Sequence, residues 1–357
     1  MVSKIFSRVK LLLIFTIILP ILSSGCLKKT PAAITVLPYI TQKLPISERK
    51  FYIGFVPNPA SAPKSTFNDI IKAYEEAREI AEISVVWVAK QSLGEYELLK
   101  KNRLITAIRV YGLKPLITLN FATLKQSQNG LEYVIDAPSG INPSLSDLEF
   151  RQLWKNEAKK IAQEFRPEYF SLGNEINDYF YFHPDEFETY LSLVKQVYNE
   201  IKSVCPDTKV LVVLSYNHLI ENNQWDMLTK LDSCVDLIGL TTYPYKKFST
   251  PDDIPIDYYS RLKQYITKPV AFTEIGWSST GKNTEKIQAD FLIKFLELTK
   301  GLDIEMINWL FLHETTLTGI IAQISHPDVT TIALKRPDGR KKEVYDIWVA
   351  LKQLKRR

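Results

Sequence analysis

Short apolar runs alternate with amphipathic segments along the chain from residue 51 onward. Each run is continuous rather than alternating in polarity, as expected for strands of a parallel sheet that is covered on both faces. The predicted strands are Phe51–Val56, Ile83–Val88, Pro115–Asn120, Tyr169–Leu172, Val210–Leu214, Leu237–Thr241, Val270–Thr273 and Met306–Leu312.

The segments between these runs carry apolar residues at helical spacing. In the first segment, Phe67, Ile70, Tyr74 and Ala77 share one face. The third begins with a serine cap at Ser146, followed three residues later by Glu149, and Pro184 suits the first turn of the fourth. The predicted helices are Thr66–Ala81, Ser92–Tyr111, Ser146–Phe165, Asp185–Val204, Trp225–Leu231, Tyr258–Ile266, Thr284–Lys300 and Glu343–Leu354.

Eight strand–helix units in one chain predict a single-domain α/β fold, a (β/α)8 TIM barrel over residues 49–357. An open, doubly wound sheet is the alternative architecture. The longest insertion, Phe121–Pro143, follows the third strand and is rich in Asn, Gln, Ser and Gly. We expect it to form a loop over one end of the barrel.

The first 26 residues read as a targeting segment rather than as part of the fold. Lys4, Arg8 and Lys10 precede the apolar run Leu11–Leu22, and small residues lead into Cys26. These are the parts of a signal peptide, and the junction resembles a lipobox with Leu22 one place farther from the cysteine than usual. The resemblance implies lipidation at Cys26. The signal-peptide features predict an exported protein that is membrane-anchored or secreted, and residues 27–48, which contain three prolines, are predicted to form a tether. An uncut membrane anchor is the alternative.

Composition narrows the remaining classes of function. The net charge of +5 is spread over 357 residues without a motif for nucleic acid, so we expect no nucleic-acid partner. The four histidines are scattered, and we expect no metal or cofactor. Cys205 and Cys234 each precede an apolar run, which places them at the same end of the sheet and leaves two possibilities, a disulfide or two buried thiols. We expect a monomer.

The chemistry-bearing residues fall where predicted strands end, which is where barrel enzymes carry their active sites. Glu175 follows the fourth strand and Glu274 the seventh, 99 residues later. Two carboxyl groups at the rim of one barrel are the equipment that hydrolyses a glycosidic bond.

Amide and aromatic side chains accompany the two glutamates at the strand ends. Rings stack on the apolar faces of sugars, and amides bind their hydroxyls. The predicted substrate-binding residues are Asn120, Asn174, Trp87, Tyr243, Trp277 and Trp309. The aromatic run Tyr179–His183 allows two interpretations, sugar stacking or core packing.

The motifs Gly173-Asn-Glu175 and Thr273-Glu-Ile-Gly-Trp277 are similar to those of clan A of the glycoside hydrolases, retaining (β/α)8-barrel glycosidases, and most similar to the family 53 endo-β-1,4-galactanases. The resemblance implies that Glu175 is the general acid/base and Glu274 the nucleophile. Asn174 would bind the hydroxyl next to the anomeric carbon, Tyr243 would contact Glu274, and Trp309 would floor the cleavage subsite.

The chain departs from the family 53 pattern at two places. These departures weaken the prediction of a galactan substrate more than the resemblance to clan A. The chain has Ile275 after the second glutamate, where the galactanases tend to have threonine, and Asn177–Phe180 where they usually carry Gly and Trp. The sequence thus predicts a retaining hydrolase of a β-linked glycan, with about 5 to 5.5 Å between the two carboxyl groups. The alternative is a cell-surface lipoprotein that binds glycans without cutting them.

Overall fold

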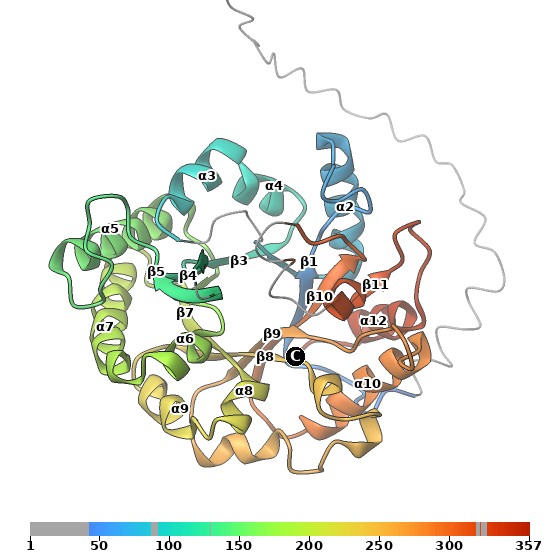
Figure 1. Cartoon of the computed structure of the whole chain (residues 1–357). Coiled ribbons are helices and arrows are strands. Elements are labelled where there is room, and N and C mark those ends of the chain that lie inside the picture. The colour runs from blue at the N-terminus through green and yellow to red at the C-terminus, as the bar shows by residue number, and fades with distance from the viewer. Residues whose placement is uncertain (1–42, 87–91, 129, 319–321, 323–326) are drawn as a thin grey trace, which may run out of the picture.

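The computed structural model describes residues 43–86, 92–128, 130–318, 322 and 327–357. Its centre is a closed parallel barrel surrounded by helices (Figure 1). The barrel closes because the first strand pairs with the last, which rules out the open-sheet alternative. All eight predicted strands are present, with ends shifted by a few residues: β1 (Tyr52–Val56), β2 (Ile83–Val85), β3 (Lys114–Thr118), β6 (Tyr169–Ser171), β7 (Lys209–Ser215), β8 (Leu237–Thr242), β9 (Val270–Ile275) and β10 (Ile304–His313).

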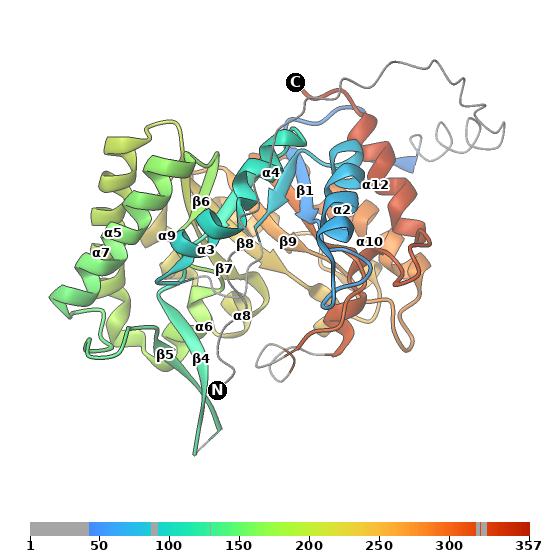
Figure 2. The same ribbon diagram turned by 90° about the horizontal axis from the view of Figure 1, so that it is seen from above.

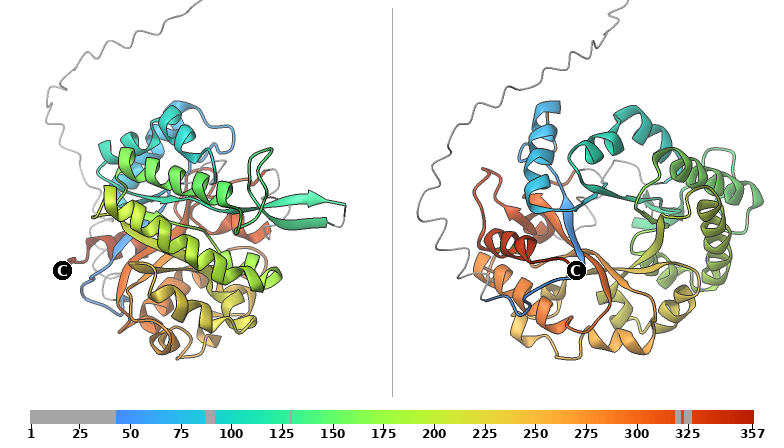
Figure 3. Two further views of the ribbon diagram at one scale, coloured as in Figure 1. Left: turned by 90° about the vertical axis from the view of Figure 1, so that its left-hand side faces the viewer. Right: turned by 180° about the vertical axis from the view of Figure 1, so that it is seen from behind.

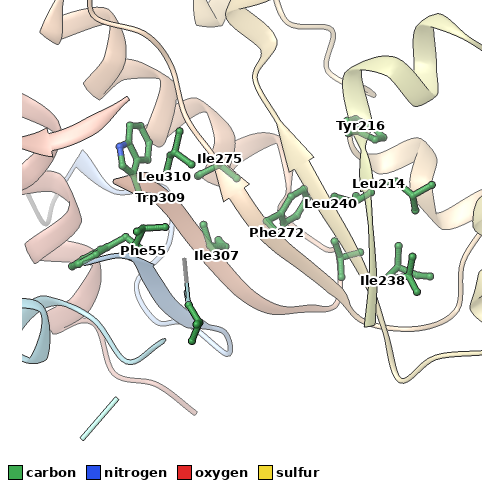
Figure 4. Packing of buried hydrophobic residues seen from close by; sticks show 14 of the residues in the cluster. Phe55, Leu214, Tyr216, Ile238, Leu240, Phe272, Ile275, Ile307, Trp309 and Leu310 are labelled. Carbon is green, nitrogen blue, oxygen red and sulfur yellow. The ribbon is translucent and has the colours of Figure 1, made fainter. Parts of the chain in front are cut away.

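Apolar side chains fill both faces of the barrel wall. A small cluster within the barrel includes Ile83, Leu116, Leu211 and Met306. A much larger cluster lies between the strands and the helices, and Figure 4 shows Phe55, Phe272 and Ile307 in it. Burial on both faces explains why the strands read as continuous apolar runs.

The outer helices follow most of the predicted segments. They are α2 (Phe67–Ile80), α3 (Glu95–Asn102), α4 (Leu104–Val110), α5 (Leu148–Phe165), α6 (Ile176–Phe182), α7 (Phe187–Val204), α8 (Tyr216–Glu221), α9 (Trp225–Asp232), α10 (Glu285–Leu298) and α12 (Glu343–Gln353). No helix in these described ranges has the length and apolar character needed to cross a bilayer.

Three helix predictions need correction. The segment Ser92–Tyr111 is two helices, because Arg103 adopts a left-handed conformation between α3 and α4. The cap of α5 is Asp147, whose carboxylate accepts from the Phe150 N–H at 2.8 Å, and not Ser146. The segment Tyr258–Ile266 forms only a 3₁₀ turn, Ser260–Gln264.

Consecutive buried tyrosines account for the missing helix after β8. Tyr258 and Tyr259 are both buried and pack edge to face, and Tyr259 also contacts Tyr216 and Phe272. Neighbouring residues of an α-helix point about 100° apart, so burying both rings in one core favours tight turns. Core packing has overridden helical periodicity here.

The insertion after β3 is more ordered than predicted. It contains an antiparallel hairpin of β4 (Ala122–Ser127) and β5 (Gly130–Ile135), which extends away from the carboxyl end of the barrel (Figures 2 and 3). A further short strand, β11 (Ala333–Lys335), pairs in parallel with the end of β10.

The structure shows whether the two cysteines form a disulfide. Cys205 and Cys234 are buried and free, so the second of the two possibilities, two buried thiols, is the one observed. Each sulfur has a nearby polar partner instead: the Thr208 hydroxyl donates to Cys205 Sγ at 3.1 Å, and Cys234 Sγ donates to the Lys230 carbonyl at 3.3 Å.

The predicted tether joins the fold before its expected end at residue 48. Leu44 is buried and Ile46 packs against the core. Behind them, the buried Arg49 guanidinium donates to both carboxylate oxygens of Glu82, at 2.7 and 3.1 Å. The Arg49 backbone also bonds to Lys355 and Arg357, so this pair lies where the two ends of the domain meet.

We predict that Glu82→Gln lowers the free energy of unfolding by about 3 kcal/mol at pH 7, because it leaves a buried guanidinium without its countercharge. Burial raises the pKa of Glu82, but Arg49 and Lys352 outweigh it and lower the pKa overall. A carboxyl with a lowered folded-state pKa stabilises above its unfolded pKa of about 4, so the difference shrinks as pH falls below that value. Urea unfolding at pH 7 and pH 3 measures it.

The control for this prediction is Asp338→Asn, which removes an exposed ion pair with Arg340 and is expected to change stability little. If Glu82→Gln unfolds like the wild type, the pair does not stabilise the meeting of the chain ends.

Candidate active site

A strained turn places Glu175 at the carboxyl end of β6. Gly173 has a φ of +138°, and a Cβ there would lie 2.4 Å from Ile176 Cγ2, so the turn requires glycine. Two residues later, Glu175 itself is left-handed, with φ 50° and ψ 41°. Such a conformation is uncommon for a residue with a long side chain, and strain of this kind concentrates at functional sites.

The end of β8 links Glu175 to Glu274. Glu274 lies in β9, and its Cα is in register with that of Thr241 in β8. The Thr241 hydroxyl donates to Glu175 Oε1 at 2.6 Å. One residue is therefore the strand neighbour of one carboxyl group and the hydrogen-bond donor to the other, which brings the two predicted catalytic residues together.

Tyr243 donates its hydroxyl to Glu274 Oε2 at 2.6 Å, so the predicted contact is confirmed. Asn217 of α8 holds the Tyr243 backbone from both sides. Its Oδ1 accepts from the Tyr243 N–H at 2.9 Å, and its Nδ2 donates to the Tyr243 carbonyl at 3.3 Å. The phenol is thus fixed in position before any ligand binds.

The side-chain amide of Asn174 faces Glu274 and lowers the pKa of its carboxyl group. The Asn174 backbone N–H donates to Asn120 Oδ1 at 2.7 Å. Asn120 also accepts from Trp154 Nε1 through its carbonyl, at 3.2 Å. Asn120 is therefore half-buried beside the site and anchors the turn that carries Asn174 and Glu175.

Both carboxyl groups have a raised pKa. Burial is the main cause for each, and the charge of Asp178 adds to it at Glu175. For Glu274, burial and the charge of Glu175 raise the pKa to about 7, against the hydrogen bonds from Tyr243 and Asn174. Among the residues that the structure describes, Tyr243 and Asn174 lower the pKa of Glu274 and the Thr241 hydroxyl lowers that of Glu175, where the charge of Asp178 acts in the opposite direction. The proton of the pair therefore resides preferentially on Glu175.

An ion pair and a lysine surround the two glutamates. Asp178, one turn after Glu175, bonds to His218 Nδ1 at 2.6 Å, which raises the pKa of the imidazole. The exposed Lys246 lies with its Nζ 5.6 Å from the centre of the Tyr243 ring. Its charge stabilises the ionised form of both glutamates, more weakly than burial opposes it.

Two predicted substrate-binding tryptophans are wrong. Trp309 has no exposed surface and packs against Phe291 and Trp348 of the outer helices, so it belongs to the layer outside the barrel (Figure 4). Trp277 is equally buried, and its Nε1 donates to Asn283 at 3.3 Å. Neither ring is accessible to a ligand.

The remaining predicted residues, Trp87 and Cys26, lie outside the described residues. Within the described ranges, no group of three or more His, Cys, Asp or Glu side chains is arranged to hold a metal ion. Three residues that contribute to the site were missed: Thr241, Asn217 and Asp178. Asp178 could have been noticed as an acidic residue only three positions after Glu175.

A sequence comparison supports the predicted resemblance. The profile of glycosyl hydrolase family 53 matches residues 154–312, which include Glu175, Tyr243 and Glu274. No protein with a curated description matches the sequence.

Solved structures share the fold at low identity. An exo-β-1,4-mannosidase from Opitutaceae bacterium strain TAV5 is 16% identical, with a TM-score of 0.64 over 86% of this chain and 60% of its own. A family 39 glycoside hydrolase from Bacteroides cellulosilyticus WH2 is 19% identical (TM-score 0.57; 87% and 64% covered). GH5_18 from Streptomyces cattleya, in complex with Manb1-4GlcNAc, is 11% identical (TM-score 0.61; 84% and 79% covered). The chain thus spans less than two thirds of the length of the first two.

We predict that Glu274→Gln stabilises the fold at neutral pH, by about 3 kcal/mol at pH 7.5. An acid whose pKa is raised on folding binds its proton more tightly in the native state, so stability falls as pH rises from about 4 to the folded pKa of about 7. The amide has no such proton, so the difference should vanish near pH 4. Thermal or urea unfolding from pH 4 to pH 7.5 measures it.

The matched control is Glu297→Gln on the exposed face of α10, which should show no such pH dependence. A Glu274→Gln variant that is less stable than the wild type at pH 7.5 would show that the carboxylate holds structure instead.

Proposed function

We propose that this protein is a retaining glycoside hydrolase that acts on a β-linked glycan, with β-1,4-galactan as the first candidate. The observation that carries the proposal is the pair of half-buried glutamates at one end of the barrel. They are linked through Thr241 and differ in the hydrogen-bond donors around them. The family 53 match and the glycosidases among the structural neighbours support the same class of enzyme.

The different surroundings of Glu175 and Glu274 indicate which of them is the acid/base and which is the nucleophile. Glu175, which retains the proton, donates it to the glycosidic oxygen as the bond to the anomeric carbon breaks. Glu274, held ionised by Tyr243 and Asn174, attacks that carbon and forms a glycosyl ester. Glu175, now a carboxylate, takes a proton from water, and the hydroxide equivalent displaces Glu274. Two inversions give net retention.

The neighbouring residues tune these steps. The Tyr243 hydroxyl and the Asn174 amide lower the pKa of Glu274, against the burial that raises it. As the ester forms, the negative charge that these donors stabilise is consumed, and the Asn174 amide becomes available to a sugar hydroxyl. The negative charge of Asp178 keeps Glu175 protonated at higher pH.

We also propose that the protein is exported and held at the membrane by a lipid on Cys26. The apolar run Leu11–Leu22 and the small residues before the cysteine support this. Mass spectrometry of the mature amino terminus distinguishes a lipidated Cys26 from an uncut anchor.

We predict that Glu175→Gln and Glu274→Gln each reduce the release of reducing sugar by about a thousandfold, because each removes one of the two proton-transfer or nucleophilic groups. The assay uses β-1,4-galactan, β-1,4-mannan, β-1,4-xylan and β-1,4-glucan, and Glu297→Gln is the matched carboxylate control. Wild-type protein that binds one of these polymers without releasing sugar would identify a glycan-binding protein instead.

We predict that two conservative variants shift opposite limbs of the pH–rate profile. Tyr243→Phe removes a donor from Glu274, which raises the pKa of that carboxyl and moves the acidic limb of kcat/KM upward by about one unit. Thr241→Val removes the donor from Glu175 and moves the alkaline limb upward by a similar amount. Because the glutamates titrate as a pair, both limbs are fitted together. If Tyr243→Phe moves the alkaline limb alone, the roles are reversed.

A further inference from the structure

The helix that follows Glu175 exposes two aromatic rings at its far end. Tyr181 and Phe182 are 56% and 65% exposed, whereas the preceding Tyr179 and Phe180 are buried against Phe121. Core packing is therefore confirmed for Tyr179 and Phe180, and sugar stacking stays a prediction for Tyr181 and Phe182. Half of the aromatic run packs in the core, and half faces solvent.

The hairpin after β3 adds a third ring to this surface. Tyr133 of β5 stacks on Phe182, with ring centres 6.4 Å apart and planes 29° apart. Tyr181 lies edge to face with Phe182 at 5.1 Å. Leu131, partly exposed and two residues before Tyr133, shares its face of the strand. We call Leu131, Tyr133, Tyr181 and Phe182 the aromatic platform.

The aromatic platform lies at the far end of the helix that begins after Glu175. Glu175 is the residue that caps α6, and Phe182 ends that helix, so about 10 Å of helix axis separates them. Tyr133 is the connecting side chain. Its ring is half-buried, and burial, with the charges of Asp178 and Glu175, raises the pKa of its hydroxyl.

The position of the platform specifies the part of the substrate that would lie on it. It is on the side of Glu175, which donates a proton to the departing sugar, so it follows the leaving group rather than the sugar that bonds to Glu274. A pyranose presents apolar C–H groups on its faces, and flat exposed rings match these without requiring a particular hydroxyl pattern. Contiguous exposed apolar side chains on a monomer mark such interaction surfaces.

We propose that the aromatic platform binds the leaving-group side of a polysaccharide, beyond the sugar next to the cleaved bond, so that the protein prefers polymers to short glycosides. This rests on the proposed hydrolase function for the direction of the chain. The binding of a glycan to these rings does not itself require turnover.

The test combines Tyr181→Ala and Phe182→Ala in one variant and compares it with the wild type and with Val110→Ala. Val110 is 73% exposed at the end of α4, just before β3 and so at the opposite end of the barrel. Affinity electrophoresis in native gels containing β-1,4-galactan, β-1,4-mannan, β-1,4-xylan or β-1,4-glucan measures binding. We expect the double variant to lose about tenfold in affinity for the polymer that retards the wild type, and Val110→Ala to lose none.

Turnover gives a separate readout. On the hydrolysed polymer, the double variant should show a raised KM with kcat within a factor of about two, and its kcat/KM for the matching 4-nitrophenyl β-glycoside should be unchanged. Equal retardation of the double variant and the wild type overturns the platform, as does retardation of the wild type in none of the gels. Binding that depends on the platform without any sugar release overturns the hydrolase proposal alone.

Light scattering tests whether the aromatic platform binds a second copy of the protein instead of a glycan. If light scattering shows a wild-type dimer that the double variant converts to a monomer, the platform is an interface between two copies and not a glycan surface.

Discussion

The hydrogen bond from Thr241 to Glu175 is the contact on which the arrangement of the site depends. Thr241 lies opposite Glu274 in the β8–β9 ladder, so a single strand end fixes the positions of both carboxyl groups. Two residues later the same strand end provides Tyr243, which bonds to Glu274. The direct hydrogen bonds that the structure shows to either carboxylate come from neutral groups. These hydrogen bonds offset burial and mutual repulsion only in part, so one proton is retained by the pair.

The strained turn and the two half-buried glutamates lower the free energy of unfolding. Glu175 occupies a left-handed conformation, Gly173 is required for the turn, and both glutamates are ionised less easily than in water. The surrounding structure offsets this with ordinary means: a closed ladder of strands, a double apolar layer, and the Arg49–Glu82 pair at the far end. The two glutamates thus lie at one end of the barrel, and the Arg49–Glu82 pair lies at the other.

The strands and the two glutamates were readable from sequence for a simple physical reason. A buried parallel strand is apolar on both faces, so a polar residue at its end stands out. The same property conceals which side chains of a strand point into the barrel and which point toward the helices. Trp309 and its neighbours in β10 are all buried, and a continuous apolar run does not distinguish the two directions. The prediction that Trp309 lines the site came from the resemblance, and the packing against Trp348 contradicts it.

Predictions made from short sequence patterns were wrong where contacts between distant segments determine the local structure. The tyrosines after β8 follow core packing rather than helical period, and Asp147 rather than Ser146 caps α5. The insertion after β3 reads as polar and loop-like, yet its hairpin brings Tyr133 next to Phe182, 49 residues away in sequence. Contacts between segments so far apart have no signature in the composition of either one.

The stereochemistry of hydrolysis tests the account most directly. Proton NMR of a freshly started digestion shows which anomer of the released sugar forms before mutarotation. With Glu274 as nucleophile and Glu175 as acid/base, the β anomer must appear first from a β-linked polymer. An α anomer appearing first would mean that water attacks directly, and would contradict the covalent role of Glu274.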